Sequence, residues 1–325
     1  MVPDADEFAR RSEPYRRELL AHCYRMLGAV DEAEDLVQET YLRAWRSYGT
    51  FEGRSSLRVW LYRIATNACL TALRHHGRRA LPSDLGGAAD DADAPPGPAG
   101  PDTAWLRPIP DALVTAEADP AAIVVARESL RLALIAGLQH LPPRQRAVLI
   151  LREVLAFPAP EVATMLNTTT AAVKSMLQRA RGRLDEMDPE RERILEPTDP
   201  HARALLDQYI AGFENADTAA LERALRTDAA IELVGTGTWF SGRATCLRFL
   251  ARVIGSPGDW RMIPTIANGQ PAAAAYQHDG QGIHRAFGIG VLTATDAGIA
   301  RVVVFGGGLA LASRFGLPAT HEARA

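Results

Sequence analysis

Two carboxylates near the start of the chain are spaced to act together. Asp35 and Glu39 stand four residues apart in the amphipathic pattern 31–46, with Gln38 between them, so the three polar side chains share one helix face. A compact acidic face of this kind could bind a basic protein surface. It could also be an ordinary solvated face on which Arg43, four residues after Glu39, forms an ion pair.

A second helix is predicted from Leu57, because Ser56 is a suitable N-cap and apolar residues then recur at helical spacing. Aromatic rings and arginines alternate on this helix and just before it. That combination can hold unstacked bases against a phosphate backbone, so we expect single-stranded DNA to bind here. The candidate DNA-binding residues of this part are Phe51, Arg54, Arg58, Trp60, Tyr62, Arg63 and Asn67. Trp60 could equally be a core residue.

A second candidate DNA-binding element lies at residues 161–184. A short helix is predicted at 161–166, a turn follows at 167–169, and Thr169 can cap a longer helix that begins at Thr170. Helix, short turn and helix form a helix-turn-helix, whose second helix presents its first turns to the major groove. The candidate contacts on that helix are Thr170, Ala171, Lys174, Ser175, Gln178 and Arg179.

Charge is segregated along the chain. Residues 81–125 contain eight acidic residues and one arginine, a net charge of −7, whereas the whole chain has a net charge of −3. This stretch is also rich in Pro, Gly and Ala, which predicts an irregular linker between two mildly basic helical domains. Because its charge resembles that of a nucleic acid strand, the linker could thread a nucleic-acid channel, or it could be a plain spacer.

The composition excludes several classes of protein. With 47% hydrophobic and 23% charged residues, the chain is too apolar for a disordered protein. It has no run of about 18 apolar residues and no signal-peptide pattern at its start, so we expect a cytoplasmic protein that does not enter the membrane. Three widely spaced cysteines lack metal-ligand spacing, which predicts buried thiols, no disulfide, no metal and no cofactor.

The predicted secondary structure changes after about residue 198, from helices alone to helices and strands. Helical patterns at 203–214 and 218–226 are followed by strand patterns at 229–233, 272–277, 284–294 and 299–305. The fold class predicted for the whole chain is therefore multidomain: two all-α helical domains followed by an α+β domain. The expected boundaries are 12–80, 81–125 for the acidic Pro-rich linker, 126–187 for the helix-turn-helix domain, and 201–318.

The front of the chain resembles region 2 of the sigma-70 family, in its extracytoplasmic-function type, through DEAEDLVQETYLRAWRSYGTFEGRSSLRVWLYRIATNACLTALRHHGRR. The segments LPPRQRAVLILREVL and EVATMLNTTTAAVKSMLQRARGRL resemble region 4 of the same family. The resemblance implies a sigma factor, a non-catalytic subunit that directs the bacterial RNA polymerase core to promoter DNA. Region 2 would then melt the minus-ten element, and region 4 would recognise the minus-thirty-five element.

The resemblance also implies roles for individual residues. Asp35, Gln38 and Glu39 match the family's acidic motif that docks on the polymerase core. Phe51 and Asn67 match positions that border the pocket for a flipped base. The linker matches segments that thread the polymerase channel.

The last domain resembles the SnoaL-like cone-shaped α+β domains, through LLDQYIAGFENADTAALERALRTDAAIEL, WFSGRATCLRFL and IARVVVFGGGLALASRFGLP. Relatives of this group include enzymes with paired His and Asp, and His278, Asp279 and His284 are the candidates here. However, His278-Asp279-Gly280 predicts a hairpin turn, which would place the first two at a rim. We expect no catalysis, and we expect the fused domain to regulate the two DNA-binding domains. The candidates for lining a small-ligand pocket are Trp239, Phe240 and Trp260.

A helix-turn-helix transcription regulator with a ligand-sensing or enzymatic C-terminal domain is the alternative function. Such a regulator would bind a duplex site by itself, without the polymerase core.

Overall fold

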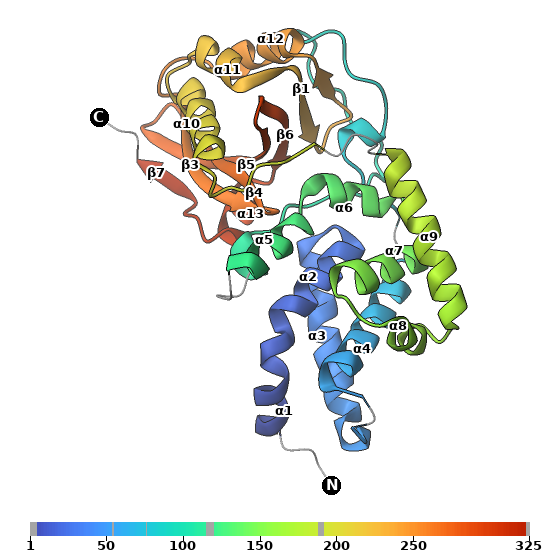
Figure 1. Ribbon diagram of the computed structural model, residues 1–325. Helices are drawn as coiled ribbons and strands as arrows, with labels where there is room; N and C mark the ends of the chain where they lie inside the picture. The colour runs from blue at the N-terminus through green and yellow to red at the C-terminus, as the bar shows by residue number, and fades with distance from the viewer. Residues whose placement is uncertain (1–4, 54, 76, 115–119, 188–191, 323–325) are drawn as a thin grey trace. The chain divides into compact units, whose positions relative to one another are not determined.

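The chain divides into two units, which are shown in the computed structural model of Figure 1. The structure describes residues 5–53, 55–75, 77–114, 120–187 and 192–322. The first unit comprises Met1–Arg79 and Ala112–Arg191, and the second comprises Ala80–Asp111 and Glu192–Ala325. The chain therefore enters the second unit, returns to the first and then finishes in the second.

The first half of the first unit is a group of helices around a common core. These are α1 (Ala5–Ser12), α2 (Arg16–Leu27), α3 (Val30–Ser47) and α4 (Leu57–Ala72). Helix α2 ends at Gly28, whose φ of 73° is a left-handed conformation that glycine adopts without strain. Helix α4 begins where predicted, because the Ser56 hydroxyl accepts a hydrogen bond from the Val59 amide at 3.2 Å.

The second half of the first unit is also helical. Its elements are α5 (Pro120–Glu128), α6 (Leu132–Gln139), α7 (Pro143–Leu149), a π-helical turn (Ile150–Val154), α8 (Ala159–Met165) and α9 (Thr170–Met187). Helix α9 starts at the predicted cap, where the Thr169 hydroxyl accepts a hydrogen bond from the Ala172 amide at 3.1 Å. Helices α8 and α9, joined by residues 166–169, form the helix-turn-helix.

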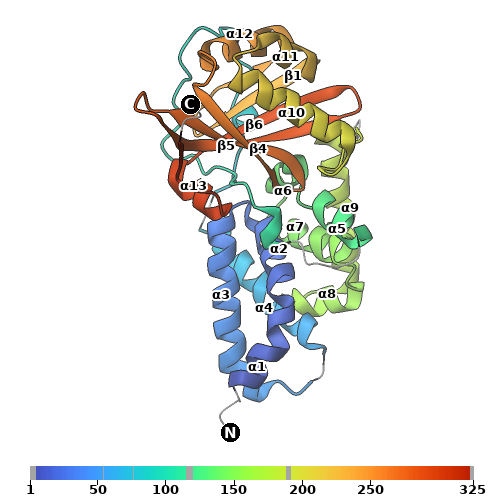
Figure 2. The same cartoon turned by 90° about the vertical axis from the view of Figure 1, so that its left-hand side faces the viewer.

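The second unit is a sheet on which helices pack. Its strands are β1 (Leu225–Val234), β2 (Trp239–Ser241), β3 (Trp260–Ala267), β4 (Gln270–His278), β5 (Ile283–Thr295), β6 (Gly298–Gly306) and β7 (Thr320–Glu322). Its helices are α10 (Pro200–Glu214), α11 (Thr218–Ala224), α12 (Arg243–Val253) and α13 (Gly308–Arg314). The strand order is β2-β1-β6-β5-β4-β3, with β7 paired to β5. Figure 2 shows α10, α11 and α12 on the same side of the sheet.

An apolar core joins these helices to the sheet. It contains Tyr209 and Phe213 from α10, Phe249 from α12, and Trp260 and Val302 from the strands. The domain is thus an α+β unit, as predicted, and its helices pack on the sheet through apolar side chains.

The segment Ala80–Asp111, which we call the strap, belongs to the second unit. Eighty residues of the first unit separate it in the chain from the rest of the second unit, which begins at Glu192. It has no long helix or strand, but its main chain is held by hydrogen bonds from the sheet and from α12. Ala92 of the strap is fully buried in the core of the second unit. The strap is therefore an ordered part of this unit.

The fold class predicted from the sequence, two all-α parts followed by an α+β domain, is confirmed. Among the described residues, none of the helices is long and apolar enough to cross a membrane. Within the same residues, no group of three or more His, Cys, Asp or Glu side chains is placed to hold a metal ion. The three cysteines are buried, as predicted.

Candidate nucleic-acid interface

One face of α9 is open to solvent over its first three turns. The six residues predicted to contact DNA on this helix are all exposed. Val173, Leu177 and Ala180 are buried on the opposite side and attach the helix to the rest of the unit. The apolar spacing of α9 therefore leaves its polar residues free to meet a duplex.

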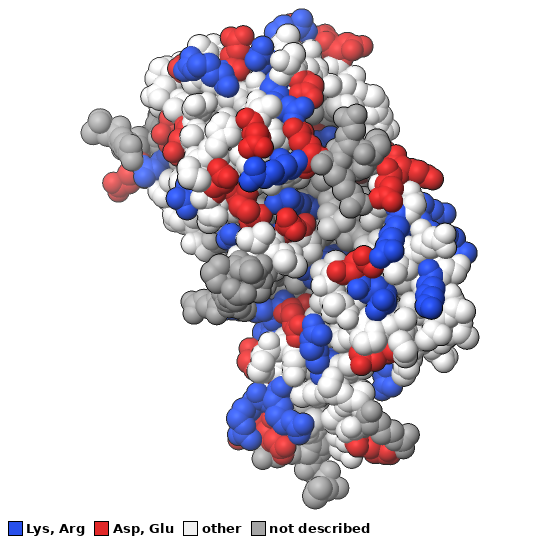
Figure 3. Space-filling model, viewed as in Figure 1, with Lys and Arg blue, Asp and Glu red and all other residues white. Residues whose placement is uncertain are grey.

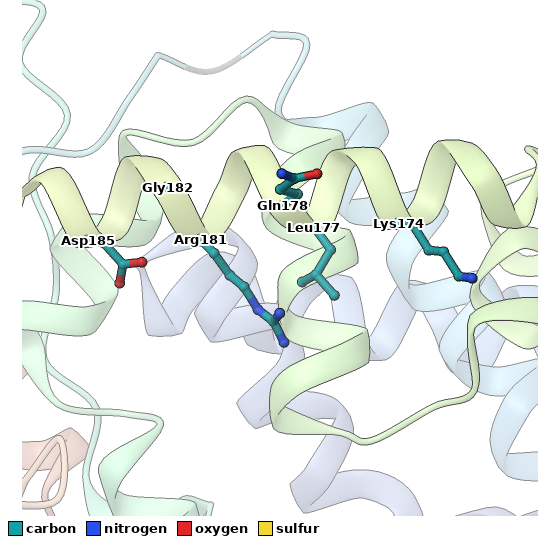
Figure 4. A pocket seen from close by; sticks show the side chains of 6 residues that line it. All are labelled: Lys174, Leu177, Gln178, Arg181, Gly182 and Asp185. Carbon is teal, nitrogen blue, oxygen red and sulfur yellow. The ribbon is translucent and has the colours of Figure 1, made fainter.

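A groove runs along α9, as Figure 4 shows. It is lined by Lys174, Leu177, Gln178, Arg181, Gly182 and Asp185. Lys174 and Arg181 extend from the same side of the helix in this view. Gly182 has no side chain, and the space beside it is open, because a Cβ placed there would have no atom within 4 Å. The helix can therefore be approached closely by a partner.

Basic side chains gather over α9 in Figure 3. Arg179 and Arg183 are exposed, and Arg181 is exposed while donating to the Glu153 carboxylate at 2.7 Å. Exposed ion pairs of this type are weak, so Arg181 can exchange Glu153 for a phosphate at small cost. The cationic C-terminal end of α9 is thus suited to contact phosphates, whereas its first turns are suited to contact base edges.

The predicted DNA-binding residues on α4 separate into two groups. Arg63 and Asn67 are exposed, whereas Trp60 is only 7% exposed and Tyr62 is fully buried. Tyr62 donates its hydroxyl to Glu18 at 3.2 Å. Burial raises the pKa of Tyr62, which keeps the phenol protonated. Trp60 and Tyr62 therefore pack inside the unit in this conformation, and Arg54 lies outside the described residues.

Arg58 is held by a carboxylate that the sequence did not single out. Its guanidinium donates twice to Glu18, at 2.9 and 3.0 Å, and it lies over the Tyr62 ring at 5.1 Å from the centroid. Glu18 is thus a common partner of two predicted DNA-binding residues. Its position in α2, forty residues before Arg58, gives no local pattern that could have revealed this role.

Phe51 is part of an aromatic cluster at the start of α4. Its ring centroid is 4.8 Å from that of Trp60 and 6.3 Å from that of Tyr48. Asn67 follows Trp60 by seven residues, a rise of about 10 Å along the helix. Seven residues are about two helical turns, so Trp60 and Asn67 lie on the same side of α4, and Phe51, which precedes the helix, packs against it at Trp60.

The acidic face of α3 is present. Asp35 and Gln38 are exposed, and Glu39 is half-buried and accepts a hydrogen bond from Arg43 at 2.5 Å. The ion pair between Glu39 and Arg43 is the ordinary i,i+4 pair that the spacing allowed. Asp35 is an exposed acid on the same face, where a basic partner could reach it.

The three aromatic residues proposed for a ligand pocket lie on strands at opposite ends of the sheet order. Trp239 and Phe240 are on β2, and Trp260 is on β3. Phe240 is fully buried and stacks on Phe249 at 4.6 Å, while Trp260 packs edge-on against Phe213 at 5.8 Å. The Trp239 indole instead donates to the Gly86 carbonyl of the strap at 2.9 Å. A ligand pocket formed by all three stays a prediction.

His278 and Asp279 lie at the β4–β5 hairpin, as the turn pattern predicted. His284, the second residue of β5, is paired with His278, and the ring centroids of the two histidines are 5.2 Å apart. The Asp279 carboxylate accepts hydrogen bonds from the amides of Gln281 and Ile283 and from Arg285, and these bonds lower its pKa. Such a carboxylate closes the hairpin and is poorly suited to accept a proton.

Family comparisons match both halves of the first unit. Residues 12–79 match Sigma-70 region 2, and residues 131–184 match Sigma-70, region 4. The ECF RNA polymerase sigma factor SigG of Mycobacterium tuberculosis is 47% identical over 320 residues, which are 96% of this chain and 84% of that protein. The ECF RNA polymerase sigma factor SigW of Bacillus subtilis is 29% identical over 55% of this chain and 87% of its own length.

One solved structure is similar in fold over most of the chain. The crystal structure of the Mycobacterium tuberculosis extracytoplasmic function sigma factor SigJ matches with a TM-score of 0.61 and 23% identity. The match covers 97% of this chain and 100% of that chain. At this level of identity the match supports the fold, including the α+β domain after the helical parts.

The groove on α9 leads to a testable prediction. Lys174→Ala should weaken binding to promoter duplex by a similar factor for all sequences and reduce the salt slope of log K by about 1, because a phosphate contact is lost. Gln178→Ala should instead relax sequence preference. Fluorescence anisotropy of labelled promoter duplex with the protein bound to polymerase core, over a range of salt concentrations, measures both effects. Thr164→Ala on α8, also exposed, is the matched control. An unchanged salt slope for Lys174→Ala would remove α9 from the DNA interface.

Proposed function

The chain belongs to the extracytoplasmic-function RNA polymerase sigma factors, and on this premise we propose that it binds promoter DNA through α4 and α9 and opens the duplex at the minus-ten element. The observation that supports this most is the pair of DNA-suited surfaces in the right order along the chain. One is the exposed polar face of α9, and the other is the helix α4 with its arginines and neighbouring aromatic rings.

Strand opening in this proposal uses binding energy. Extruding one base costs a few kcal/mol of stacking, which aromatic and amide contacts in a preformed site can offset. Phe51 is half-buried and packs against Trp60. Asn67 is exposed, seven residues beyond Trp60 on α4. These are the groups that would stack on the base and hydrogen-bond to its edge. No nucleotide hydrolysis is needed, and we propose that the chain itself is not an enzyme.

The polymerase core is the proposed partner of the acidic face on α3. Asp35 and Gln38 are exposed there, and an acidic helix face attracts a basic surface with a strength that depends on salt. The partner is a cytoplasmic enzyme, so the protein would act in the cytoplasm.

Reversing one charge on this face provides a test. Asp35→Arg should weaken core binding by about tenfold or more, because it replaces an attraction with a repulsion between like charges. Glu128→Arg, an equal change at another exposed acid of the same unit, should bind the core normally. Surface plasmon resonance with immobilised core measures both affinities. Equal affinities for the two variants would rule out this face as the docking surface.

Promoter opening can be separated from polymerase binding. Phe51→Ala and Asn67→Ala should bind the core like the parent protein but lower the permanganate reactivity of thymines in the minus-ten element, because the extruded base loses its stacking or hydrogen-bonding partner. Thr71→Ala, four residues beyond Asn67 on α4 and exposed, serves as control. Thymine reactivity that stays at the parent level in both variants would contradict the assignment.

The last domain is proposed to regulate the protein by holding the strap. The Glu232 carboxylate, fully buried, accepts a hydrogen bond from the Ser83 amide at 2.9 Å and pairs with Arg301. Further along the strap, Arg248 and Arg252 of α12 donate to the carbonyls of Asp90 and Ala92. The strap is thus held through its main chain, by a carboxylate at Ser83 and by arginines at Asp90 and Ala92, and hydrogen bonds to charged groups are stronger than those between neutral groups.

This binding bears on the proposed path of the linker. A strap that is bound to the domain is not available to thread a polymerase channel, so the domain and the channel would compete for the same acidic segment. A domain tethered beside the strap holds it at high effective concentration, and detachment therefore needs a competing partner. The polymerase core is that partner in our proposal.

Loosening the strap should raise transcription. The double variant Arg248→Ala and Arg252→Ala removes the two α12 side chains that donate hydrogen bonds to the strap. It should increase amide hydrogen exchange at residues 88–93, and it should increase the yield of run-off transcripts. Arg223→Ala, which removes one positive charge from the neighbouring α11, should change neither. If exchange rises but transcript yield and abortive products stay the same, the strap is only a spacer.

A further inference from the structure

Three histidines stand side by side across one end of the sheet in the second unit. His278 of β4 is paired with His284 of β5, and His284 is paired in turn with His321 of β7. The side chains of residues that face each other in antiparallel strands lie close together on the same side of the sheet. The chain thus brings three imidazoles together from three strands, and we call them the histidine row.

The middle histidine of the row is enclosed. His284 is 5% exposed, and the centroid of its ring lies 5.2 Å from that of His278. Its Nε2 donates a hydrogen bond to the Gly258 carbonyl at 2.8 Å, so Nε2 carries the hydrogen of the neutral ring. Its Nδ1 is then an acceptor, and this atom is buried without a hydrogen-bond partner.

His321 is held in a similar way. Its ring lies edge-on against that of Tyr276, with the centroids 4.5 Å apart and an interplanar angle of 81°. Its Nε2 is buried without a hydrogen-bond partner, like Nδ1 of His284. Over the residues that the structure describes, no carboxylate pairs with any imidazole of the row. The row is thus packed as neutral rings.

The charges around the row disfavour a further proton. Burial, the positive charge of Arg261 on β3 and the neighbouring His284 together lower the pKa of His321. Asp279, at the hairpin between β4 and β5, is already engaged by Arg285 at 3.0 Å. An imidazolium in the row would therefore meet positive charge without gaining an acceptor.

The other ionisable groups nearby do not change this balance. The carboxylates of Asp259 and Glu214 accept amide hydrogen bonds at 2.8 and 3.0 Å. Burial raises the pKa of Tyr276, which keeps its phenol neutral. Glu322 belongs to β7 itself, where successive side chains point to opposite faces, so its carboxylate lies on the face away from the row. Helix α13, which packs on β5, has Arg314 as its only charged residue.

Strand β7 is short. It has three residues, which pair with residues 283–285 of β5. The segment before it is held by hydrogen bonds from the Tyr276 hydroxyl to the Pro318 carbonyl at 2.9 Å and from the Ala286 amide to the Ala319 carbonyl at 3.0 Å. A short terminal strand opens at a smaller free-energy cost than the core strands. Strand β7 can therefore detach while the rest of the sheet stays folded.

The direction of the pH effect follows from these contacts. With β7 detached, His321 is in water, where a histidine has a pKa of about 6.5. With β7 in place the pKa of His321 is lower, so the detached form binds a proton at a pH at which the docked form does not. The stability of docked β7 is therefore fully present above about pH 6.5 and is lost as the pH falls below this value.

We propose that the histidine row is a pH-sensitive latch, in which neutral imidazoles hold β7 on β5 and protonation releases it. Release exposes the edge of β5 at residues 283–285, because a strand edge without its neighbour has unpaired amides and carbonyls. This role is separate from promoter binding and from the contacts that hold the strap.

Hydrogen–deuterium exchange of the full-length protein tests the latch. Peptides that span residues 316–322 report on β7, and peptides from β6 report on the rest of the sheet. Between about pH 7.5 and about pH 5.5, protection of the β7 peptides, corrected for intrinsic exchange, should fall about tenfold, the factor for one proton that binds only to the detached form. Protection of β6 should change by less than about twofold.

Two variants separate the charge of His321 from its packing. His321→Phe keeps an aromatic ring against Tyr276, and His321→Gln keeps a polar side chain, but neither can be protonated. Both should keep β7 protected to within about twofold at the two pH values. His201→Gln, at an exposed histidine of α10, is the matched control and should show the pH dependence of the parent protein.

Each of the other outcomes overturns the proposal. Equal protection of β7 in the parent protein at both pH values would show that there is no latch. A pH dependence that both His321 variants retain would place the sensor at another group. Loss of protection in β6 together with β7 would show acid unfolding of the whole domain. If β7 is unprotected at both pH values in both variants, a neutral side chain is not what holds it.

Discussion

Helix α2 is buried on all sides, and this constraint organises the first unit. Every residue from Leu19 to Leu27 is buried, including His22 and Arg25, so the polar groups need partners from neighbouring elements. His22 Nε2 is 2.9 Å from the Thr66 hydroxyl of α4, and burial together with Arg25 lowers the pKa of this histidine to about 3. The imidazole is therefore neutral at physiological pH.

Two further polar groups of α2, the Arg25 guanidinium and the Met26 carbonyl, pair with the second half of the unit, while Glu18 pairs with Arg58 and Tyr62 of α4. Ser129 accepts from Arg25, and Arg146 donates to the Met26 carbonyl. The helix that forms the core of region 2 is thus also packed against the region 4 half of the unit.

In the second unit, main-chain polar groups likewise find partners in other elements. The strap has few regular hydrogen bonds of its own, so its amides and carbonyls pair with the sheet. At one end the Ile109 amide donates to Asn268, whose own amide donates to the Ile109 carbonyl. At the other end the Ser83 amide is bound by Glu232. Both units therefore satisfy buried polar groups through contacts between segments that lie far apart in the chain.

Much of this arrangement could be predicted from the sequence, and the reasons for the exceptions are physical. The caps Ser56 and Thr169 and the exposed face of α9 follow from local patterns, because propensity, capping and periodicity act over a few residues. The order of the strap could not be predicted, since composition rich in Pro, Gly and Asp describes a flexible linker unless another element supplies the hydrogen bonds. Strand β3 was missed, because Pro264 is unusual in a strand and is accepted here on the edge of the sheet.

Long-range pairings were the least predictable features. Cys23 and Cys69 are 46 positions apart in the sequence, yet their thiols are hydrogen-bonded between α2 and α4, which together with burial raises the pKa of Cys69. The role of Glu18 depends on helix packing in the same way. Trp239 and Trp260, by contrast, are residue types that often line ligand pockets, but they lie on strands at opposite ends of the sheet order.

The central claim is that this chain gives promoter specificity to the RNA polymerase core. Run-off transcription with purified core on a library of promoter sequences tests it most directly, beside a footprint of the same DNA with the protein alone. The account predicts transcripts that start at a defined subset of sequences only when core and protein are both present, and no strong footprint from the protein alone. A tight footprint on duplex DNA without core, together with transcripts that do not depend on the protein, would contradict it.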